Sequence, residues 1–181
     1  QLCGTDLAIV RMRQLGYETV TMDEAVARIA ADAPSAPFVV FSFDDAYRDN
    51  LVHALPVLRR HNCPFTLYVP TAFVDGVGEV WWQALEDIVA MREAIALDGP
   101  DGEQIYLDTK TDAQKHAAYN QLYAQMRAMP EPDRVQLIRT LGHKYGLDLD
   151  AHCKSLIMDW AELKTVADDP LCTIGAHTVN H

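Results

Sequence analysis

The feature that most constrains the fold is an apolar run that ends on two adjacent carboxylates. The run, Phe38-Val39-Val40-Phe41-Ser42-Phe43, is followed directly by Asp44 and Asp45. It predicts a buried strand, and a parallel α/β sheet covers such strands on both faces. The carboxyl ends of these strands usually carry the chemistry. Because like charges repel, the paired acids indicate a metal ion, a shared proton or a basic partner, unless they form an Asp turn or a helix cap.

Helical and strand patterns alternate on both sides of this run. Apolar spacing predicts a helix over 8–15 that ends at Gly16, and Thr21 with Glu24 forms a capping-box pattern for a second helix. A short strand over 18–20 separates them, and after the two acids come a helix over 50–60 and a strand over 65–69. Pro56 should bend that later helix or mark its first turn. This alternation is typical of an α/β fold.

In residues 75–158 the regular alternation of helical and strand patterns stops, and this segment is predicted to be a mostly helical insertion. One strand-like run, 104–107, lies among three long helical patterns: 81–96, one capped by Thr111 and Gln114, and one with Pro132 in its first turn. Trp81, Trp82, Tyr119 and Tyr123 could line a sugar-binding surface, but their helical spacing favours core packing. Asp159 and Glu162 then cap a short helix over 160–167, and a strand over 171–175 follows.

Two histidines follow that last predicted strand at a spacing of four residues. On one helical turn, the Cβ atoms of His177 and His181 would lie about 5–6 Å apart on the same face, so both rings could reach one ion. A lone His-x-x-x-His pattern also occurs as a pair of surface imidazoles. Position strengthens the metal hypothesis, because the ends of parallel strands share one face and would bring an aspartate to the two histidines.

An aspartate and two histidines leave coordination positions open for water and substrate, which is typical of a catalytic site. A metal ion there would activate water and polarise a carbonyl oxygen, while the carboxylate that is not a ligand takes the proton, so amide or ester hydrolysis is expected. Two histidines and one carboxylate also occur in non-haem iron oxygenases. The α/β pattern and the long separation between Asp45 and His177 favour hydrolysis.

The segment Ser42-Phe43-Asp44-Asp45-Ala46-Tyr47-Arg48-Asp49-Asn50 resembles the first motif of the polysaccharide deacetylases, carbohydrate esterase family 4, which share the NodB-homology domain. The segment His177-Thr178-Val179-Asn180-His181 resembles their second motif. The resemblance covers about residues 9–75 and 158–181. It implies metal-dependent N- or O-deacetylation of an acetylated carbohydrate. By position, Asp44 would be the general base, and Asp45, His177 and His181 would hold a divalent metal ion, with zinc preferred.

The resemblance implies an α/β chain that forms an incomplete, distorted (β/α) barrel of the NodB-homology type, with the helical insertion over 75–158. Three departures accompany it. Ala46 stands where the family usually has Gly, the segment between the motifs is long, and the family's later motifs are missing. Leu141-Gly142-His143 resembles one late motif in letters, but it precedes the metal histidines. We therefore expect a single truncated domain over 1–181 that is inactive alone. The alternatives are a non-catalytic carbohydrate-binding or structural remnant, or another metal-dependent hydrolase acting on carbon–nitrogen bonds.

Composition limits partners and location. The net charge of −11 and the lack of any basic cluster longer than Arg59-Arg60 argue against nucleic acid and anionic lipid as main partners. No apolar stretch reaches the roughly 20 residues of a membrane span, and the first residues do not resemble a signal peptide, so a cytoplasmic location is expected. Cys3, Cys63, Cys153 and Cys172 lack CxxC spacing, which predicts reduced thiols rather than a zinc knuckle or a disulfide framework.

Overall fold

The computed structural model describes residues 4–31, 34–99 and 103–181, which form two compact units. We call residues 1–78 with 154–181 the sheet unit and residues 79–153 the helical unit. The helical unit is thus one continuous segment between two stretches of the sheet unit. Its bounds lie inside the 75–158 segment that the sequence analysis treats as an insertion.

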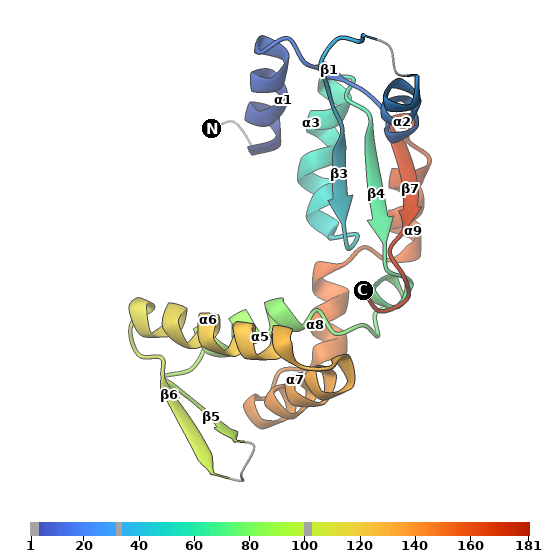
Figure 1. Ribbon diagram of the computed structural model, residues 1–181. Helices are drawn as coiled ribbons and strands as arrows, with labels where there is room; N and C mark the ends of the chain where they lie inside the picture. The colour runs from blue at the N-terminus through green and yellow to red at the C-terminus, as the bar shows by residue number, and fades with distance from the viewer. Residues whose placement is uncertain (1–3, 32–33, 100–102) are drawn as a thin grey trace. The chain divides into compact units, whose positions relative to one another are not determined.

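The sheet unit is an α/β assembly around three parallel strands (Figure 1). In chain order its elements are α1 (Gly4–Gln14), β1 (Glu18–Thr19), α2 (Met22–Ala30), β2 (Phe38–Val39), β3 (Phe41–Asp44), the π-helix η1 (Asn50–Ala54), α3 (Leu55–Arg60), β4 (Phe65–Val69), α4 (Thr71–Val74), α9 (Trp160–Ala167) and β7 (Cys172–Ala176). The strands β3, β4 and β7 pair in that order, and β1 pairs with β2 in a separate parallel ribbon. Their arrowheads point the same way in Figure 1, so their carboxyl ends lie at one edge.

Local signals in the sequence account for the ends of several elements. Gly16, with φ of 83°, follows the last turn of α1, and the Thr21 side chain accepts a hydrogen bond from the Glu24 amide at the start of α2. The capping boxes predicted for Thr111 with Gln114 and for Asp159 with Glu162 are both formed. Pro56 lies in the first turn of α3, directly after the π-helix η1, and it removes one amide donor from this continuous helical stretch.

The prediction of one strand buried on both faces is wrong for residues 38–43. The run is divided at Val40 into β2 and β3, which belong to different sheets. Its apolar residues are half-buried, and Ser42 is exposed. The physical reason is that successive side chains point to opposite faces of a strand: Phe41 and Phe43 are half-buried on one face of β3, and Ser42 and Asp44 are exposed on the other.

The helical unit has its own apolar core. It contains α5 (Trp81–Ala90), β5 (Ala94–Asp98), β6 (Gln104–Asp108), α6 (Asp112–Ala128), α7 (Glu131–Tyr145) and most of α8 (Leu149–Leu156). Leu85, Ile88, Leu122, Met126 and Ile138 are among its fully buried side chains. Trp81 is buried in this core, and Trp82, Tyr119 and Tyr123 pack against it, as their helical spacing predicts.

Two details of the helical unit differ from the sequence prediction. The helix expected over 81–96 ends at Ala90, and β5 begins at Ala94 and pairs antiparallel with β6. Ile95 and Leu97 are buried while Ala94 and Asp98 are exposed, which is the period-2 pattern of a strand. The helix α8 has no counterpart in the sequence prediction.

Three of the four cysteines can be described: Cys63 and Cys153 are buried, and Cys172 is half-buried. Cys3 lies outside the described residues. Burial raises the pKa of Cys172 to about 11, so that thiol is protonated at neutral pH. None of the helices in 4–31, 34–99 and 103–181 has both the length and the apolar content that a membrane crossing requires.

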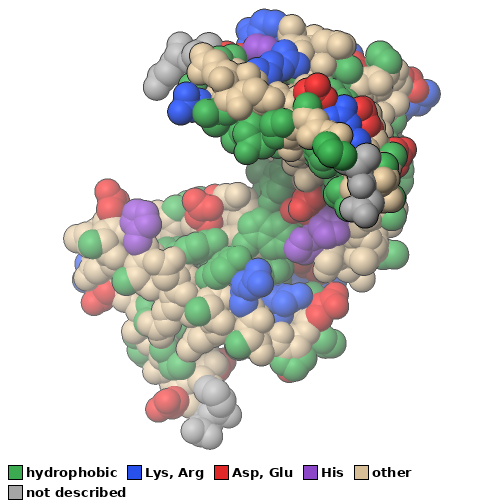
Figure 2. Space-filling model, turned by 45° about the horizontal axis from the view of Figure 1, so that its top comes forward, with side chains coloured by type: hydrophobic (Ala, Val, Ile, Leu, Met, Phe, Trp, Pro, Cys, Tyr) green, Lys and Arg blue, Asp and Glu red, His purple; other side chains and the backbone are tan. Residues whose placement is uncertain are grey.

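Basic side chains do not gather into one broad patch on the face drawn in Figure 2. They occur there as small groups among acidic, hydrophobic and other side chains.

We expect the Asp169→Asn substitution to destabilise the sheet unit in a pH-dependent way. Asp169 is buried between α9 and β7, where its carboxylate accepts hydrogen bonds from Arg59 Nε at 2.6 Å and from the Leu171 amide at 2.9 Å. Burial acts to raise the pKa of Asp169, but these two donors outweigh it and hold that pKa below its ordinary value. Losing the charged acceptor should lower the free energy of unfolding by about 1–3 kcal/mol at pH 7.

Urea unfolding at pH 7 and pH 3 tests this expectation. A lowered pKa in the folded state stabilises the fold fully above the ordinary aspartate value of about 3.9, and this stabilisation is lost as the pH falls below it. The difference between the wild type and Asp169→Asn should therefore shrink at pH 3. Asp168→Asn is the matched control, because Asp168 is exposed and pairs with exposed Lys164. An equal effect of Asp169→Asn at both pH values would contradict the ion-pair explanation.

Candidate metal centre

The sheet register brings the two sequence motifs to the same edge. Asp44 lies opposite Tyr68 of β4, and Tyr68 lies opposite Gly175 of β7. The pairing continues past the strand ends, because the Asp45 amide donates to the Tyr68 carbonyl at 3.0 Å and the His177 amide donates to the Val69 carbonyl at 3.2 Å. The residues that follow β3 and β7 are therefore held on either side of β4.

A glycine is required at position 175 by the close approach of an aromatic ring. A Cβ atom built there would lie 2.5 Å from Cδ1 of Tyr68, a distance that real Cβ contacts do not show. The ring of Tyr68 thus covers the backbone of β7 two residues before His177. The Ile174-Gly175-Ala176 segment provides this space.

Asp45, His177 and His181 form the group of side chains that could hold a metal ion. The Oδ1 atom of Asp45 lies 3.7 Å from Nε2 of His177 and 3.6 Å from Nε2 of His181. One potential ligand atom from each of the three residues lies within 4.8 Å of the other two. Two ligand atoms of a tetrahedral site, each about 2.1 Å from the ion, are about 3.4 Å apart. The observed spacing is close to that value.

Burial of the aspartate supports the fit to a cation. Asp45 is 8% exposed, and its Oδ1 is buried without a hydrogen-bond partner among the described residues. An unpaired buried carboxylate oxygen is costly, and a bound cation would remove that cost. The pKa of Asp45 is raised overall. Burial is the largest cause, the charge of Asp44 adds to it, and the two imidazoles act in the opposite direction. A divalent ion suits both the donor set and this electrostatic environment.

The backbone around Asp45 adopts an uncommon conformation. Asp45 and Ala46 have φ values of 69° and 56°, in the left-handed region. Each such non-glycine residue costs about 1–2 kcal/mol, and strain of this kind is typical of functional sites. The Ala46 position therefore does require the positive φ for which the family usually uses glycine. The turn directs the side chain of Asp45 toward the histidines, whereas Asp44, the last residue of β3, is exposed.

The two histidines lie on a turn, and the prediction that they share one helical turn is wrong. Thr178 and His181 have φ values of 60° and 78°, which an α-helix does not permit. The His181 amide instead donates to Oγ1 of Thr178 at 3.1 Å. The rings of His177 and His181 still approach, with centroids 4.7 Å apart at 83°. A compact turn brings residues four apart together just as a helical turn would.

The helix α4 supports this histidine turn. The Ala72 amide donates to the Val179 carbonyl at 2.9 Å, and the ring of Phe73 stacks on that of His181 with centroids 6.1 Å apart at 24°. The sequence analysis gives no role to Phe73. The available signal was its position four residues after β4, in a segment that, like the two motifs, follows the carboxyl end of a strand.

Arg48 is the second residue whose role the sequence analysis missed. Its Nε donates to Oε1 of Glu162 at 2.9 Å and to Oε2 at 3.1 Å. Its Nη2 donates to the carbonyl oxygens of Lys154 at 2.9 Å and Ile157 at 2.8 Å, and its Nη1 donates to that of Ser155. The guanidinium, three residues after Asp45, thus ties the strained turn to the end of α8 and to the start of α9.

The remaining candidate from the sequence analysis lies elsewhere. His143, the histidine of Leu141-Gly142-His143, is an exposed residue near the end of α7 in the helical unit. It does not belong to the Asp45, His177 and His181 group. Its similarity in letters to a late family motif therefore has no counterpart at the candidate metal centre.

Comparison with known proteins agrees with both motifs. The family model described as "Polysaccharide deacetylase" matches residues 31–181, which is most of the chain. The chain is also similar to "Putative polysaccharide deacetylase YxkH" of Bacillus subtilis (strain 168), with 38% identity over 55 residues that cover 30% of this chain and 20% of that protein.

A solved structure, the BpsB deacetylase domain from Bordetella bronchiseptica, matches with a TM-score of 0.48 and 16% identity, covering 98% of this chain and 44% of that one. The chain thus spans less than half the length of each of these two relatives. The family-model match extends from before the first motif through the second. It confirms the resemblance seen in those motifs, and the chain belongs to the polysaccharide deacetylase family with the NodB-homology domain.

Proposed function

We propose that the protein is a metal-dependent hydrolase that removes N- or O-linked acetyl groups from a carbohydrate. Asp45, His177 and His181 would hold one divalent ion, with zinc preferred for two imidazoles and a carboxylate. The observation that carries this proposal is the buried, unpartnered Oδ1 of Asp45, which lies within 3.7 Å of both imidazoles. Membership of the polysaccharide deacetylase family supports the substrate class.

The two adjacent carboxylates would have different roles, one as a metal ligand and the other as the general base. When bound, the ion would supply an activated water and polarise the acetyl carbonyl. Asp45 is buried beside the imidazoles, so its carboxylate is committed to the ion. Asp44 is exposed at the end of β3 and would accept the proton from the attacking water. The ring of Phe73 would hold His181 in place while the substrate binds.

The proposed ligands can be tested by titrating zinc into the metal-stripped protein in a calorimeter. The wild type should bind one zinc ion. Asp45→Asn and His177→Ala should each weaken zinc binding by about 100-fold or more, because each variant removes a direct ligand. Loss of a residue that only supports a ligand already costs about 10- to 100-fold. His143→Ala is the matched control, since this exposed histidine lies in the other unit.

Equal zinc affinity in the wild type, Asp45→Asn and His177→Ala would contradict the proposed ligand set. Activity would be assayed as acetate released by the whole protein from acetylated chitin-type and xylan-type oligomers. Zinc binding without acetate release from any acetylated oligomer would favour the alternative of a non-catalytic carbohydrate-binding member.

A further inference from the structure

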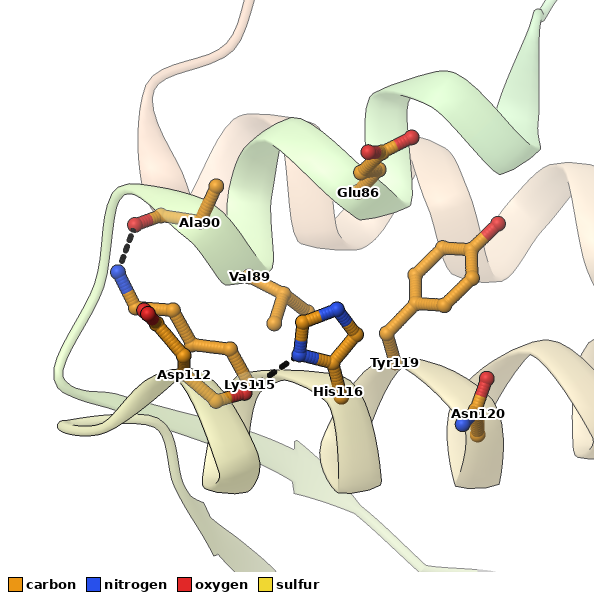
Figure 3. Close-up of a pocket in the computed structure, with 8 residues that line it drawn as sticks. All are labelled: Glu86, Val89, Ala90, Asp112, Lys115, His116, Tyr119 and Asn120. Carbon is orange, nitrogen blue, oxygen red and sulfur yellow. Dashed lines mark hydrogen bonds between the residues drawn. The ribbon is translucent and has the colours of Figure 1, made fainter.

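The helical unit contains a groove between α5 and α6 that the proposed mechanism does not use. Figure 3 shows the residues that line it. Its volume is about 330 Å³, near the lower end of the roughly 300–1,000 Å³ that ligand sites occupy. Such a volume suits one or two sugar rings. The floor is apolar at Val89 and Ala90, and the polar side chains that border it include Glu86, His116, Tyr119 and Asn120.

The hydrogen bond of His116 determines which ring nitrogen can bind a ligand. Its Nδ1 lies 2.7 Å from the carbonyl oxygen of Asp112, and a carbonyl can only accept. Nδ1 therefore carries the hydrogen, and Nε2 of the neutral ring is an acceptor. In Figure 3 the ring of His116 points from α6 into the space below α5. The groove thus contains an oriented hydrogen-bond acceptor.

Tyr119 and Asn120 add donors beside this acceptor. Burial raises the pKa of Tyr119, with Glu86 and Tyr123 adding to the effect, so its hydroxyl stays protonated and can donate. Within the described part of the chain, neither the Tyr119 hydroxyl nor the Asn120 side-chain amide has a hydrogen-bond partner. The ring of Tyr119 is fixed against Tyr123, with centroids 5.6 Å apart. The groove therefore offers a held aromatic ring next to unused donors and acceptors.

We propose that this groove is a second carbohydrate-binding site, which holds an uncharged pyranose unit. This inference takes its ligand class from the proposed function. A pyranose has an apolar C–H face that suits the Tyr119 ring and adjacent hydroxyls that both donate and accept, as the His116, Asn120 and Glu86 side chains require. Glu86 and Asp112 bring negative charge, while the Lys115 ammonium is held by the Ala90 carbonyl. An anionic sugar is disfavoured for that reason.

Tyr119 also packs against the core of the helical unit, so the test should leave its ring in place. His116 and Asn120 are exposed, and their truncation removes binding groups with little effect on the fold. The double variant His116→Ala/Asn120→Ala is therefore the main probe, and Tyr119→Phe removes only the hydroxyl. His143→Ala and Tyr106→Phe are matched controls, because both residues are exposed in the same unit and neither lines the groove.

Calorimetric titration of the metal-stripped protein with the β-1,4-linked hexamer of N-acetylglucosamine tests the site. The double variant should bind the hexamer at least about 10-fold more weakly than the wild type, and Tyr119→Phe about 2- to 10-fold more weakly, since each hydrogen bond contributes about 0.5–1.5 kcal/mol. The two control variants should match the wild type. The hexamer of galacturonic acid, which is anionic, should bind more weakly than the N-acetylglucosamine hexamer.

Unchanged hexamer affinity in the double variant would overturn this site, and so would a failure of the wild type to bind the hexamer. His177→Ala separates the two proposals, because it should lose zinc and keep hexamer binding. Loss of hexamer binding in His177→Ala, with retention in the groove variants, would place the sugar at the metal centre and overturn the groove site. Zinc binding in the groove variants reports on the metal centre alone, so either proposal can fail without the other.

Discussion

Replacing Asp44 by alanine is expected to lower the rate of acetate release by the whole protein by about 10²- to 10⁴-fold, the range typical of a lost general base. The bound zinc should remain, because Asp44 is not among the three residues whose ligand atoms converge. Its exposed position at the end of β3 leaves its carboxylate accessible to water, whereas Asp45 is buried. Steady-state rates and zinc content measured on the same samples provide the test.

The matched control for this variant is Asp49→Ala, which removes an exposed carboxylate five residues further along the same segment. Asp49→Ala should keep both zinc and turnover. Asp45→Ala should lose both, which separates a ligand from a base. Loss of zinc in Asp44→Ala together with retention in Asp45→Ala would reverse the two roles.

The location of the candidate site could be predicted from the sequence because it depends on one geometric rule. The carboxyl ends of neighbouring parallel strands meet at one edge, so acids after β3 and histidines after β7 must approach each other. The strand β4 and the helix α9 have the bounds expected from their apolar runs and caps. These local signals were sufficient to place both motifs at strand ends.

The conformation of the histidine pair could not be predicted in the same way. A spacing of four residues brings side chains together on a helix, but it also does so on a turn with left-handed residues. Thr178 has a positive φ, and its hydroxyl accepts from the His181 amide, which competes with a helical hydrogen bond. The spacing therefore predicted that the two imidazole rings would lie close together. It did not determine whether a helix or a turn would bring them there.

The hairpin of the helical unit was missed because two periodicities overlap. Ile95 lies seven residues after Ile88 and therefore fits an extension of α5, but Ile95 and Leu97 also fit a strand. Without Gly or Pro between Ala90 and Ala94, the sequence contains no strong stop signal. Pairing with β6 determines the outcome, and that pairing is a tertiary effect. The expected NodB-type barrel and cytoplasmic location stay predictions.

Arg48 shows what a motif can contain beyond its metal ligands. The Arg48→Lys variant is expected to bind zinc about 10- to 100-fold more weakly than the wild type, the usual cost of losing a group that supports a ligand from outside the first shell. A lysine keeps the charge but cannot donate from a planar fork to Glu162 and to the carbonyl oxygens of Lys154, Ser155 and Ile157 together. We expect the fold to persist, because Leu55, Leu58 and the rest of the core are unchanged.

The mechanism of this loss lies in the strained turn. Asp45 and Ala46 both hold positive φ values, and the Ala46 carbonyl accepts the Met158 amide at 3.0 Å beside the Arg48 contacts. Without the guanidinium, this turn can relax toward ordinary φ values and move the Asp45 carboxylate away from the histidines. Arg28→Lys is the matched control, since Arg28 forms exposed ion pairs at the other end of the strands. If calorimetry gave Arg48→Lys and Arg28→Lys the same zinc affinity, the turn would hold Asp45 without Arg48, and the strain would have to be balanced by the sheet register alone.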